Sequence, residues 1–129
     1  MAKTRTVYLV GHNMAGYLGD SENYFFVGSK RKAYGASRQE ARDDRQALNE
    51  GAPRSERYSL SGREGDYWLT TEHGASYHYW THDMLAERVK SADLLMERCA
   101  NCNRLIGEYG AEEAWYVPEN EAYLCDDCI

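Results

Sequence analysis

The cysteines are the feature that most constrains how this chain can fold. All four lie near its C-terminus in two Cys-x-x-Cys pairs, Cys99 with Cys102 and Cys125 with Cys128, and 22 residues separate the pairs. Each pair can offer two thiolates to one centre, and four thiolates at such spacing favour a tetrahedral zinc ion. We therefore predict one structural Zn²⁺ held by all four cysteines. Because four sulfur ligands leave no position for water, this ion is not expected to catalyse hydrolysis.

The segment between the two pairs predicts a β-hairpin over residues 115–124. Aromatic and apolar residues at 115–117 and 122–124 flank Pro118-Glu119-Asn120-Glu121, a sequence typical of a turn. Such a hairpin would return Cys125 to the neighbourhood of Cys102. It also explains a spacing slightly longer than the roughly 15–20 residues that are usual between the two pairs of a zinc site.

Three other interpretations of the cysteines are less favoured. Structural disulfides require an oxidising compartment, and residues 1–13 contain neither a long apolar run nor a small-residue cleavage signal. A thioredoxin-like redox pair follows a strand and enters a helix, whereas Cys99 follows a pattern that predicts a long helix. Iron–sulfur clusters also use four cysteines, but the spacing here matches neither ferredoxin pattern.

The two cysteine pairs resemble the knuckles of zinc-ribbon modules. The resemblance rests on Cys99-Ala-Asn-Cys102-Asn-Arg and Leu124-Cys125-Asp-Asp-Cys128 and covers the last quarter of the chain. Asn103 stands where ribbons usually have a small residue. Treble-clef relatives usually open a helix at the second pair. Here Ile129 is the last residue and directly follows Cys128, so we expect the ribbon form. The resemblance implies metal binding without a single task, since ribbons bind nucleic acid, bind protein or brace a neighbour; no family is indicated for the rest of the chain.

The remaining pattern predicts an α+β fold: a five-stranded, mostly antiparallel sheet with two helices. Alternating or β-branched segments predict strands at 4–10, 23–27, 57–60, 66–71 and 77–80. Ser37 and Glu40 have the spacing of a capping box and predict a helix over 37–48. Leu85, Val89, Ala92 and Met96 recur at helical spacing and predict a second helix over 82–98. We expect an α+β body at 1–98 and the zinc-ribbon-like module at 99–129, packed on it.

Charge is unevenly distributed along the chain. Residues 1–60 carry ten Lys and Arg against seven Asp and Glu, whereas residues 61–129 carry five against fourteen, within a net charge of −6. The acidity argues against attraction of the whole surface to nucleic acid or anionic membrane. No apolar run approaches the roughly 20 residues of a membrane span. We expect a cytoplasmic protein of unknown oligomeric state that does not contact a membrane.

A local basic cluster is the candidate nucleic-acid-binding site. Arg38, Arg42 and Arg45 fall on one side of the predicted 37–48 helix, and a basic turn with a tyrosine that can stack on a base precedes it. The alternative is a solvated helix face with local ion pairs. The candidate residues are Lys30, Arg31, Lys32, Tyr34, Arg38, Arg42 and Arg45.

The histidines suggest no catalytic site. His78, His82 and Asp83 resemble a second metal site only if both histidines are helical, and we expect two separate, hydrated histidines instead. His12 and His73 with Ser29 or Ser76 can be assembled into a triad on paper, but no nucleophile elbow accompanies them. We assign no catalytic residue and predict that the chain is not an enzyme, with an enzyme of unrecognised site as a further alternative.

The function favoured by the sequence is therefore binding of a protein partner through the acidic, aromatic C-terminal half. Small size and acidity would suit an accessory or inhibitor protein, such as the host-directed proteins of phages, including anti-CRISPR-like factors or DNA mimics that occupy a nucleic-acid-binding surface. Direct nucleic-acid binding through the basic cluster is the alternative. The candidate protein-contact residues are Glu112, Glu113, Trp115, Glu119, Glu121, Asp126 and Asp127.

Overall fold

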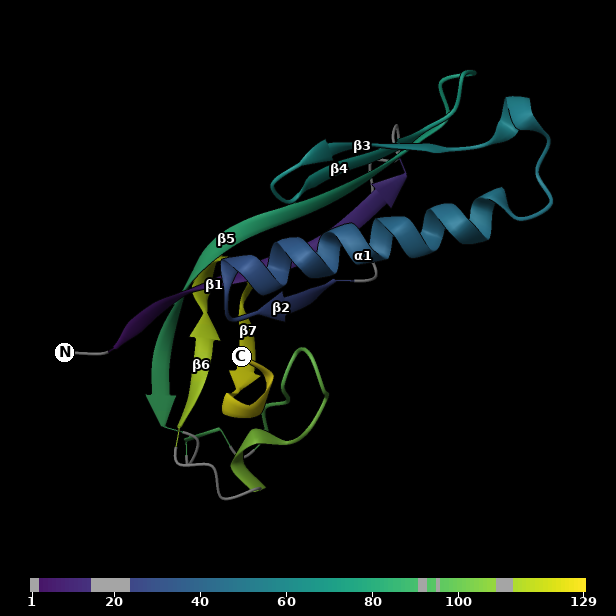
Figure 1. Cartoon of the computed structure of the whole chain (residues 1–129). Helices are drawn as coiled ribbons and strands as arrows, with labels where there is room; N and C mark the ends of the chain where they lie inside the picture. The colour runs from purple at the N-terminus through teal and green to yellow at the C-terminus, as the bar shows by residue number, and fades with distance from the viewer. Residues whose placement is uncertain (1–2, 15–23, 91–92, 95, 109–112) are drawn as a thin grey trace. The chain divides into compact units, whose positions relative to one another are not determined.

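The structure, a computed structural model, describes residues 3–14, 24–90, 93–94, 96–108 and 113–129. Figure 1 shows the arrangement of the helix and strands along the chain. The regular elements are β1 (Thr4–Met14), β2 (Phe25–Val27), α1 (Lys30–Asn49), β3 (Ser59–Arg63), β4 (Asp66–Thr70), β5 (Ser76–Lys90), β6 (Glu113–Val117) and β7 (Ala122–Cys125). Short 3₁₀ turns also lie among the described residues, including η1 (Arg54–Glu56), η3 (Ile106–Glu108), η4 (Pro118–Asn120) and η5 (Asp126–Cys128).

The predicted fold class was wrong in its count of elements. The sheet has seven strands rather than five, and the described residues form one α-helix rather than two. Five strands follow the order β2-β1-β5-β4-β3, and β6 pairs with both β5 and β7. The β3–β4, β4–β5, β5–β6 and β6–β7 pairs are all antiparallel. The fold is still a mostly antiparallel α+β fold in the broad sense.

The segment predicted as the second helix is instead the second half of β5, which continues to Lys90. Met84 and Ala86 are buried and alternate with Leu85, which is 53% exposed, so the burial has the period of a strand. Antiparallel pairing of residues 87–90 with β6 extends the strand, and Val89 lies opposite Ala114. Met96, part of the predicted helical stripe, is 85% exposed, whereas Ala92 lies outside the described residues.

Helix α1 begins at Lys30, one and a half to two turns before the predicted cap at Ser37. Ser37 is fully buried within the helix, where it lies on one face with the buried Ala33 and Ala41. Small side chains at these three positions allow close packing of that face. The helix ends at Asn49, whose side-chain amide donates to the carbonyl oxygen of Tyr58 and accepts from its N–H, at 3.0 and 2.6 Å. The loop after the helix is therefore tied to the helix end.

The other predicted strands are confirmed with shifted ends. Strand β1 extends beyond the predicted 4–10 to Met14, and β2 and β4 lie within the predicted 23–27 and 66–71, although Asn23 is outside the described residues. Strand β3 begins two residues later than predicted. The hairpin over 115–124 is present as β6, η4 and β7, with Val117 opposite Ala122 and Glu121 in the left-handed conformation that completes the turn.

The chain forms two compact units, which we describe separately. One comprises Met1–Leu9, Phe25–Lys30 and His82–Ile129, and the other comprises Val10–Tyr24 and Arg31–Thr81. The second unit has a core of Ala41, Tyr67, Leu69 and Tyr79, and α1 runs alongside the β3–β4 hairpin there (Figure 1). The first unit contains the cysteines and buries these residues among others: Val7, Phe26, Met84, Ala86, Ile106, Ala114, Val117 and Leu124.

The glycine inside α1 provides a test of the helix. Gly35 is exposed, and a Cβ added there would meet no atom within 4 Å. We expect Gly35→Ala to raise the free energy of unfolding by about 0.5–1 kcal/mol, because alanine loses less backbone entropy on folding. Urea denaturation would measure the change. Gly65→Ala is the contrasting variant, because φ is +80° and the new Cβ would lie 2.6 Å from the Tyr34 ring. Destabilisation by Gly35→Ala would contradict the helix boundaries.

Candidate metal centre

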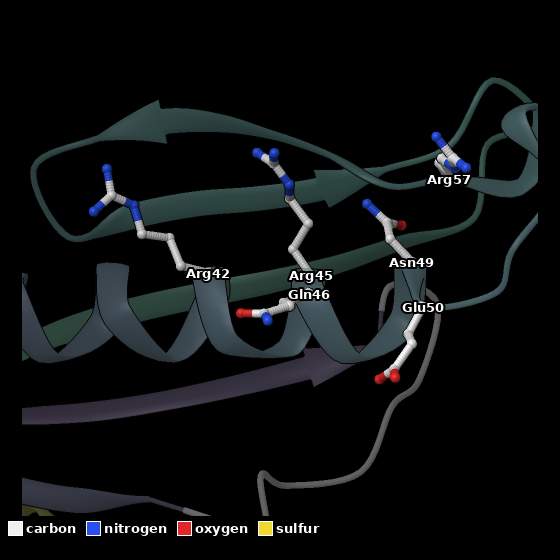
Figure 2. Close-up of a pocket in the computed structure, with 6 residues that line it drawn as sticks. All are labelled: Arg42, Arg45, Gln46, Asn49, Glu50 and Arg57. Atoms are coloured by element: carbon white, nitrogen blue, oxygen red, sulfur yellow. The ribbon is translucent and has the colours of Figure 1, made fainter.

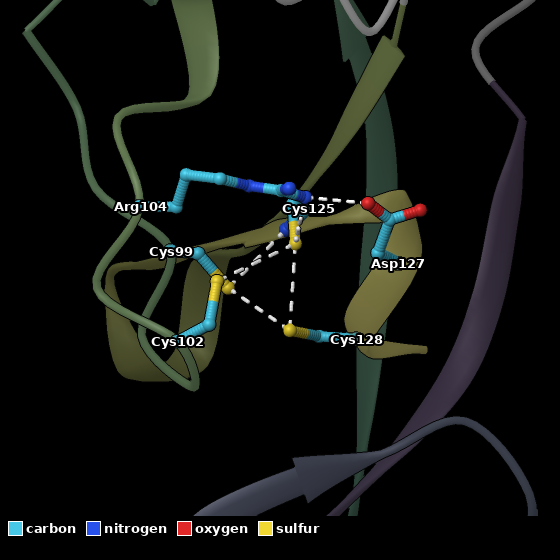
Figure 3. A network of polar contacts seen from close by, with 6 residues as sticks. All are labelled: Cys99, Cys102, Arg104, Cys125, Asp127 and Cys128. Carbon is cyan, nitrogen blue, oxygen red and sulfur yellow. Dashed lines mark hydrogen bonds and ion pairs between the residues drawn. The ribbon is translucent and has the colours of Figure 1, made fainter. Parts of the chain in front are cut away.

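The four cysteines lie close enough together to bind one metal ion. Their ligand atoms all lie within 4.8 Å of one another. The Sγ atoms are 3.6 Å apart for Cys99 and Cys128, 3.8 Å for Cys102 and Cys125, and 3.4 Å for Cys125 and Cys128 (Figure 3). These separations far exceed the S–S bond of about 2.05 Å, and all four cysteines are free thiols. The arrangement is compatible with one metal ion bound by four sulfur ligands.

The first cysteine pair lies in a tight turn that is fixed at several points. Arg98 and Leu105 form an antiparallel bridge, and the N–H of Cys99 donates to the carbonyl of Arg104 at 2.9 Å. Asn103 has φ of +61°, and its N–H donates to the carbonyl of Cys99 at 2.8 Å. Asparagine tolerates this left-handed conformation better than most residues, which explains how it occupies a position where ribbons usually have a small residue.

The same turn is anchored to β2 and β7. The Asn101 amide donates to the Phe26 carbonyl and accepts from the Phe26 N–H, both at 2.8 Å. The N–H of Ala100 donates to the carbonyl of Tyr123 in β7 at 2.9 Å. Two strands from distant parts of the sequence therefore fix where Cys99 and Cys102 lie.

The hairpin β6–β7 delivers the second cysteine pair, as the sequence predicted. Leu124 and Cys125 are buried at the end of β7, and the 3₁₀ turn η5 then presents Cys128. The backbone N–H of Cys125 points at Cys99 Sγ at 3.4 Å. Such N–H···S contacts stabilise a thiolate, the form in which cysteine binds a metal.

A charged pair lies beside the sulfurs. Arg104 Nη2 lies 2.5 Å from Asp127 Oδ2 and 3.7 Å from Cys125 Sγ, so one guanidinium group contacts both a carboxylate and a sulfur (Figure 3). The hydrogen bond to Asp127, followed by the one to Cys125, raises the pKa of Arg104. Burial and the neighbouring sulfurs raise the pKa of the Cys128 thiol. Four thiolates around one divalent ion would carry a net charge of −2, which Arg104 would partly offset.

Two residues of the predicted basic cluster, Arg42 and Arg45, line a groove of about 810 Å³, which we call the arginine groove. It is lined by Arg42, Arg45, Gln46, Asn49, Glu50 and Arg57. Figure 2 shows the side chains of Arg42, Arg45 and Arg57 extending to the same side of α1, whereas Glu50 points away. Among the described residues, neither Arg42 nor Arg45 has an ion pair. Arg57 was not predicted from the sequence, because it joins the groove through the loop after α1, which hydrogen bonds between Asn49 and Tyr58 tie to the helix end.

The other basic candidates lie outside this groove. Lys30, Arg31 and Lys32 are exposed in the first turn of α1, and Arg38 is exposed one turn before Arg42. The half-buried Tyr34 ring packs against Gly65 in the turn between β3 and β4. Of the predicted cluster, therefore, Arg42 and Arg45 line the groove, and Arg57 joins them there.

Several of the acidic candidates have partners within the molecule. Asp126 Oδ1 accepts a hydrogen bond of 2.9 Å from the buried Trp115 indole, and Asp127 contacts Arg104. Glu119 lies 3.0 Å from the His82 ring. Glu121 is exposed in the hairpin turn, Glu113 begins β6, and Glu112 lies outside the described residues.

The histidines occupy separate environments. His78 contacts Asp66 and stacks on Trp68, with ring centroids 4.0 Å apart, whereas His82 contacts Glu119. His78, His82 and Asp83 are not among the groups of potential metal ligands that the described residues bring together. His73 lies beside Glu72. The His12 ring lies against Glu40 and Tyr79.

Two groups beside His12, the Glu40 carboxyl and the Tyr79 hydroxyl, have raised pKa values. Burial raises the pKa of the Glu40 carboxyl, although the charge of His12 opposes this effect and Asp44 adds to it. Burial, followed by a hydrogen bond to Asp44, raises the pKa of Tyr79 well above its usual range, so that its hydroxyl keeps its proton. This group of residues was not predicted from the sequence, because its members come from β1, α1 and β5.

Comparison with known proteins identifies no relative: no protein-family model, curated protein or solved structure matches this chain. Within the described ranges, no helix combines the length and apolar character needed to cross a membrane.

Proposed function

We propose that this protein is a zinc-stabilised, non-enzymatic binding protein that holds a nucleic-acid strand by its phosphates in the arginine groove. One observation carries the proposal: three guanidinium groups line a single groove, and two of them have no ion pair among the described residues.

Zinc is the metal that the sulfur geometry supports best. A tetrahedron with the usual Zn–S length of about 2.3 Å has edges of about 3.8 Å. The observed Sγ separations of 3.4, 3.6 and 3.8 Å lie close to this value. Four thiolates in a closed tetrahedral arrangement are typical of structural zinc in ribbon-like modules, so the ion would fix the cysteine turns rather than take part in a reaction.

The arginine groove suits a phosphate-bearing ligand. Arg42 and Arg45 are three residues apart on α1, where like charges repel each other. A bound anion would relieve this repulsion, and the planar guanidinium group donates two parallel hydrogen bonds to phosphate. Arg57 approaches from the loop, so that a ligand would contact the basic groups of two segments, and the one acidic lining residue, Glu50, points away from them (Figure 2).

The acidic protein-contact hypothesis receives less support. Asp126, Asp127 and Glu119 already contact Trp115, Arg104 and His82. An acidic surface that is to replace a nucleic acid needs carboxylates available to a partner. The protein-partner function and any phage or inhibitor role therefore remain predictions from the sequence.

The salt dependence of oligonucleotide binding tests the proposal. We expect the double variant Arg42→Gln/Arg45→Gln to bind more weakly and to lower the slope of log affinity against log salt by about 1.4–1.8, because each lost phosphate contact removes about 0.7 for a single strand and about 0.9 for a duplex. Glutamine preserves helix propensity. Fluorescence anisotropy over a range of salt concentrations would measure both quantities. Because the chain is acidic, we expect dissociation constants of generic strands within about 10⁻⁴–10⁻⁶ M at physiological salt.

The matched control is Arg38→Gln/Arg54→Gln, which removes the same charge from residues outside the groove lining. Its salt slope should stay near the wild-type value if the groove is the binding site. Equal slopes for both double variants would indicate attraction by charge alone and would contradict the proposal. An acidic peptide that binds in the groove more tightly than any oligonucleotide would assign the site to a protein segment instead.

A further inference from the structure

A second group of metal-ligand side chains lies in the unit that contains α1, away from the cysteines in the sequence. His12 in β1 and Glu40 and Asp44 in α1 bring one ligand atom each to within 4.8 Å of one another. His12 Nδ1 lies 2.7 Å from Glu40 Oε1. Glu40 and Asp44 are four residues apart and therefore lie on the same side of the helix. Two carboxylates and an imidazole are thus directed to one place.

The group is held in position by an aromatic residue of the core. Tyr79 in β5 donates its hydroxyl proton to Asp44 Oδ2 at 2.5 Å, and its ring stacks on the His12 ring with centroids 5.1 Å apart. Tyr79 itself is almost fully buried. One residue therefore orients both a carboxylate and the imidazole, as the groups that surround metal ligands commonly do.

Two side-chain oxygen atoms in this region are buried and have no hydrogen-bond partner among the described residues. Glu40 Oε2 is buried and has no hydrogen-bond partner among them. The same holds for Ser37 Oγ, in a residue that is fully buried and lies one turn before Glu40 on the same side of α1. Leaving such atoms unpaired costs free energy, and native structures rarely do so. A cation and the water it carries would supply the missing partners.

We infer that His12, Glu40 and Asp44 form a second, mixed nitrogen and oxygen site for a divalent first-row transition ion. One imidazole and two carboxylates are harder ligands than four thiolates, and they suit Mn²⁺, Fe²⁺ or Zn²⁺. The ion offsets the negative charge of two partly buried carboxylates. It links β1 to α1 within this unit, and three protein ligands leave coordination positions for water or an anionic group.

Manganese is the probe, because its electron paramagnetic resonance signal falls when it binds and because it does not compete with zinc for thiolates. The full chain is supplied with one equivalent of Zn²⁺, which the four thiolates bind in preference to harder ligands, and is then titrated with Mn²⁺. We expect about one Mn²⁺ to bind per chain. We also expect Asp44→Asn to weaken Mn²⁺ binding by at least about tenfold, since a neutral amide replaces a carboxylate of similar size.

Asp43→Asn is the matched control, because it removes the same charge from the neighbouring, exposed position on α1. It should leave Mn²⁺ binding within about twofold of the wild type, in keeping with screening of an exposed charge. A second measurement needs no variant: bound Mn²⁺ should broaden the His12 ring resonances before those of His73, His78 and His82. No Mn²⁺ binding at millimolar concentration, equal losses in the two variants, or broadening centred on another histidine would overturn the inference.

Discussion

Removal of zinc from the four cysteines is expected to unfold the part of the protein that contains them, residues 96–108 and 113–129. Structural zinc contributes roughly 10–16 kcal/mol of binding free energy, whereas a whole domain is stable by about 5–15 kcal/mol. Within the two cysteine turns, residues 99–102 and 125–128, the buried side chains are those of Cys99 and Cys125 themselves, so these turns have little apolar packing that could replace the ion. A strong zinc chelator should abolish the thermal transition of this region, followed by circular dichroism, and zinc content should fall in parallel.

The variant Cys102→Ser separates the metal from the packing. Cys102 is exposed, so serine in its place removes one ligand and little buried surface. We expect this variant to lose zinc and to resemble the chelated wild type, and a chelator should then have no further effect on it. If protein prepared without chelator contains no zinc, or if the thiols pair as disulfides, the metal assignment is wrong. Wild-type stability in Cys102→Ser would show that the fold does not depend on the ion.

The cysteine cluster and its hairpin could be predicted because their signals are local. Two short cysteine loops and a turn at Pro118–Asn120 are read within a few residues each, and the structure places the four sulfurs together. The partners of the cluster were not predictable in the same way. Asn101 reaches β2 through hydrogen bonds to Phe26, and Arg104 reaches Asp127 across the site, so each contact depends on segments that only the folded chain brings together.

The residues of the two other sites show the same limit. Arg38, Arg42 and Arg45 were found from helical spacing, but Arg57 joins Arg42 and Arg45 only because the chain turns back after α1. His12 and Glu40 are 28 residues apart and lie on different elements. Helical periodicity can identify one side of such a site. It cannot identify the strand residue that faces it, because no local pattern records strand pairing.

The segment after residue 82 was misassigned because a spacing of four does not distinguish a helix from a strand. Leu85 and Val89 lie on one side of an α-helix, but residues four apart also lie on one face of a strand. Pairing with β6 decides between the two, and that pairing joins segments more than 20 residues apart. In the resulting strand, Met84 and Ala86 are buried and Leu85 is largely exposed.

A pair of substitutions at neighbouring positions tests this assignment. We expect Ala86→Asp to lower the free energy of unfolding by about 3–5 kcal/mol, because it places an unpaired carboxylate where the side chain is fully buried. Leu85→Asp should change it by less than about 1 kcal/mol, since this side chain is largely exposed. Urea denaturation, with a native-state spectrum for each variant, would measure both.

A helix and a strand over this segment predict opposite results: each makes a different one of the two substitutions the more destabilising. In a helix over 82–98, Leu85 would lie on the apolar stripe with Val89 and Ala86 would lie beside it, so Leu85→Asp would be the harmful change. In β5, the loss of stability falls on Ala86→Asp, whose cost approaches the stability of a marginally stable domain, so we expect little folded protein from this variant. If Ala86→Asp folds and Leu85→Asp does not, the segment is a helix. The β5–β6 pairing, which together with β7 brings the second cysteine pair to the first, would then be wrong.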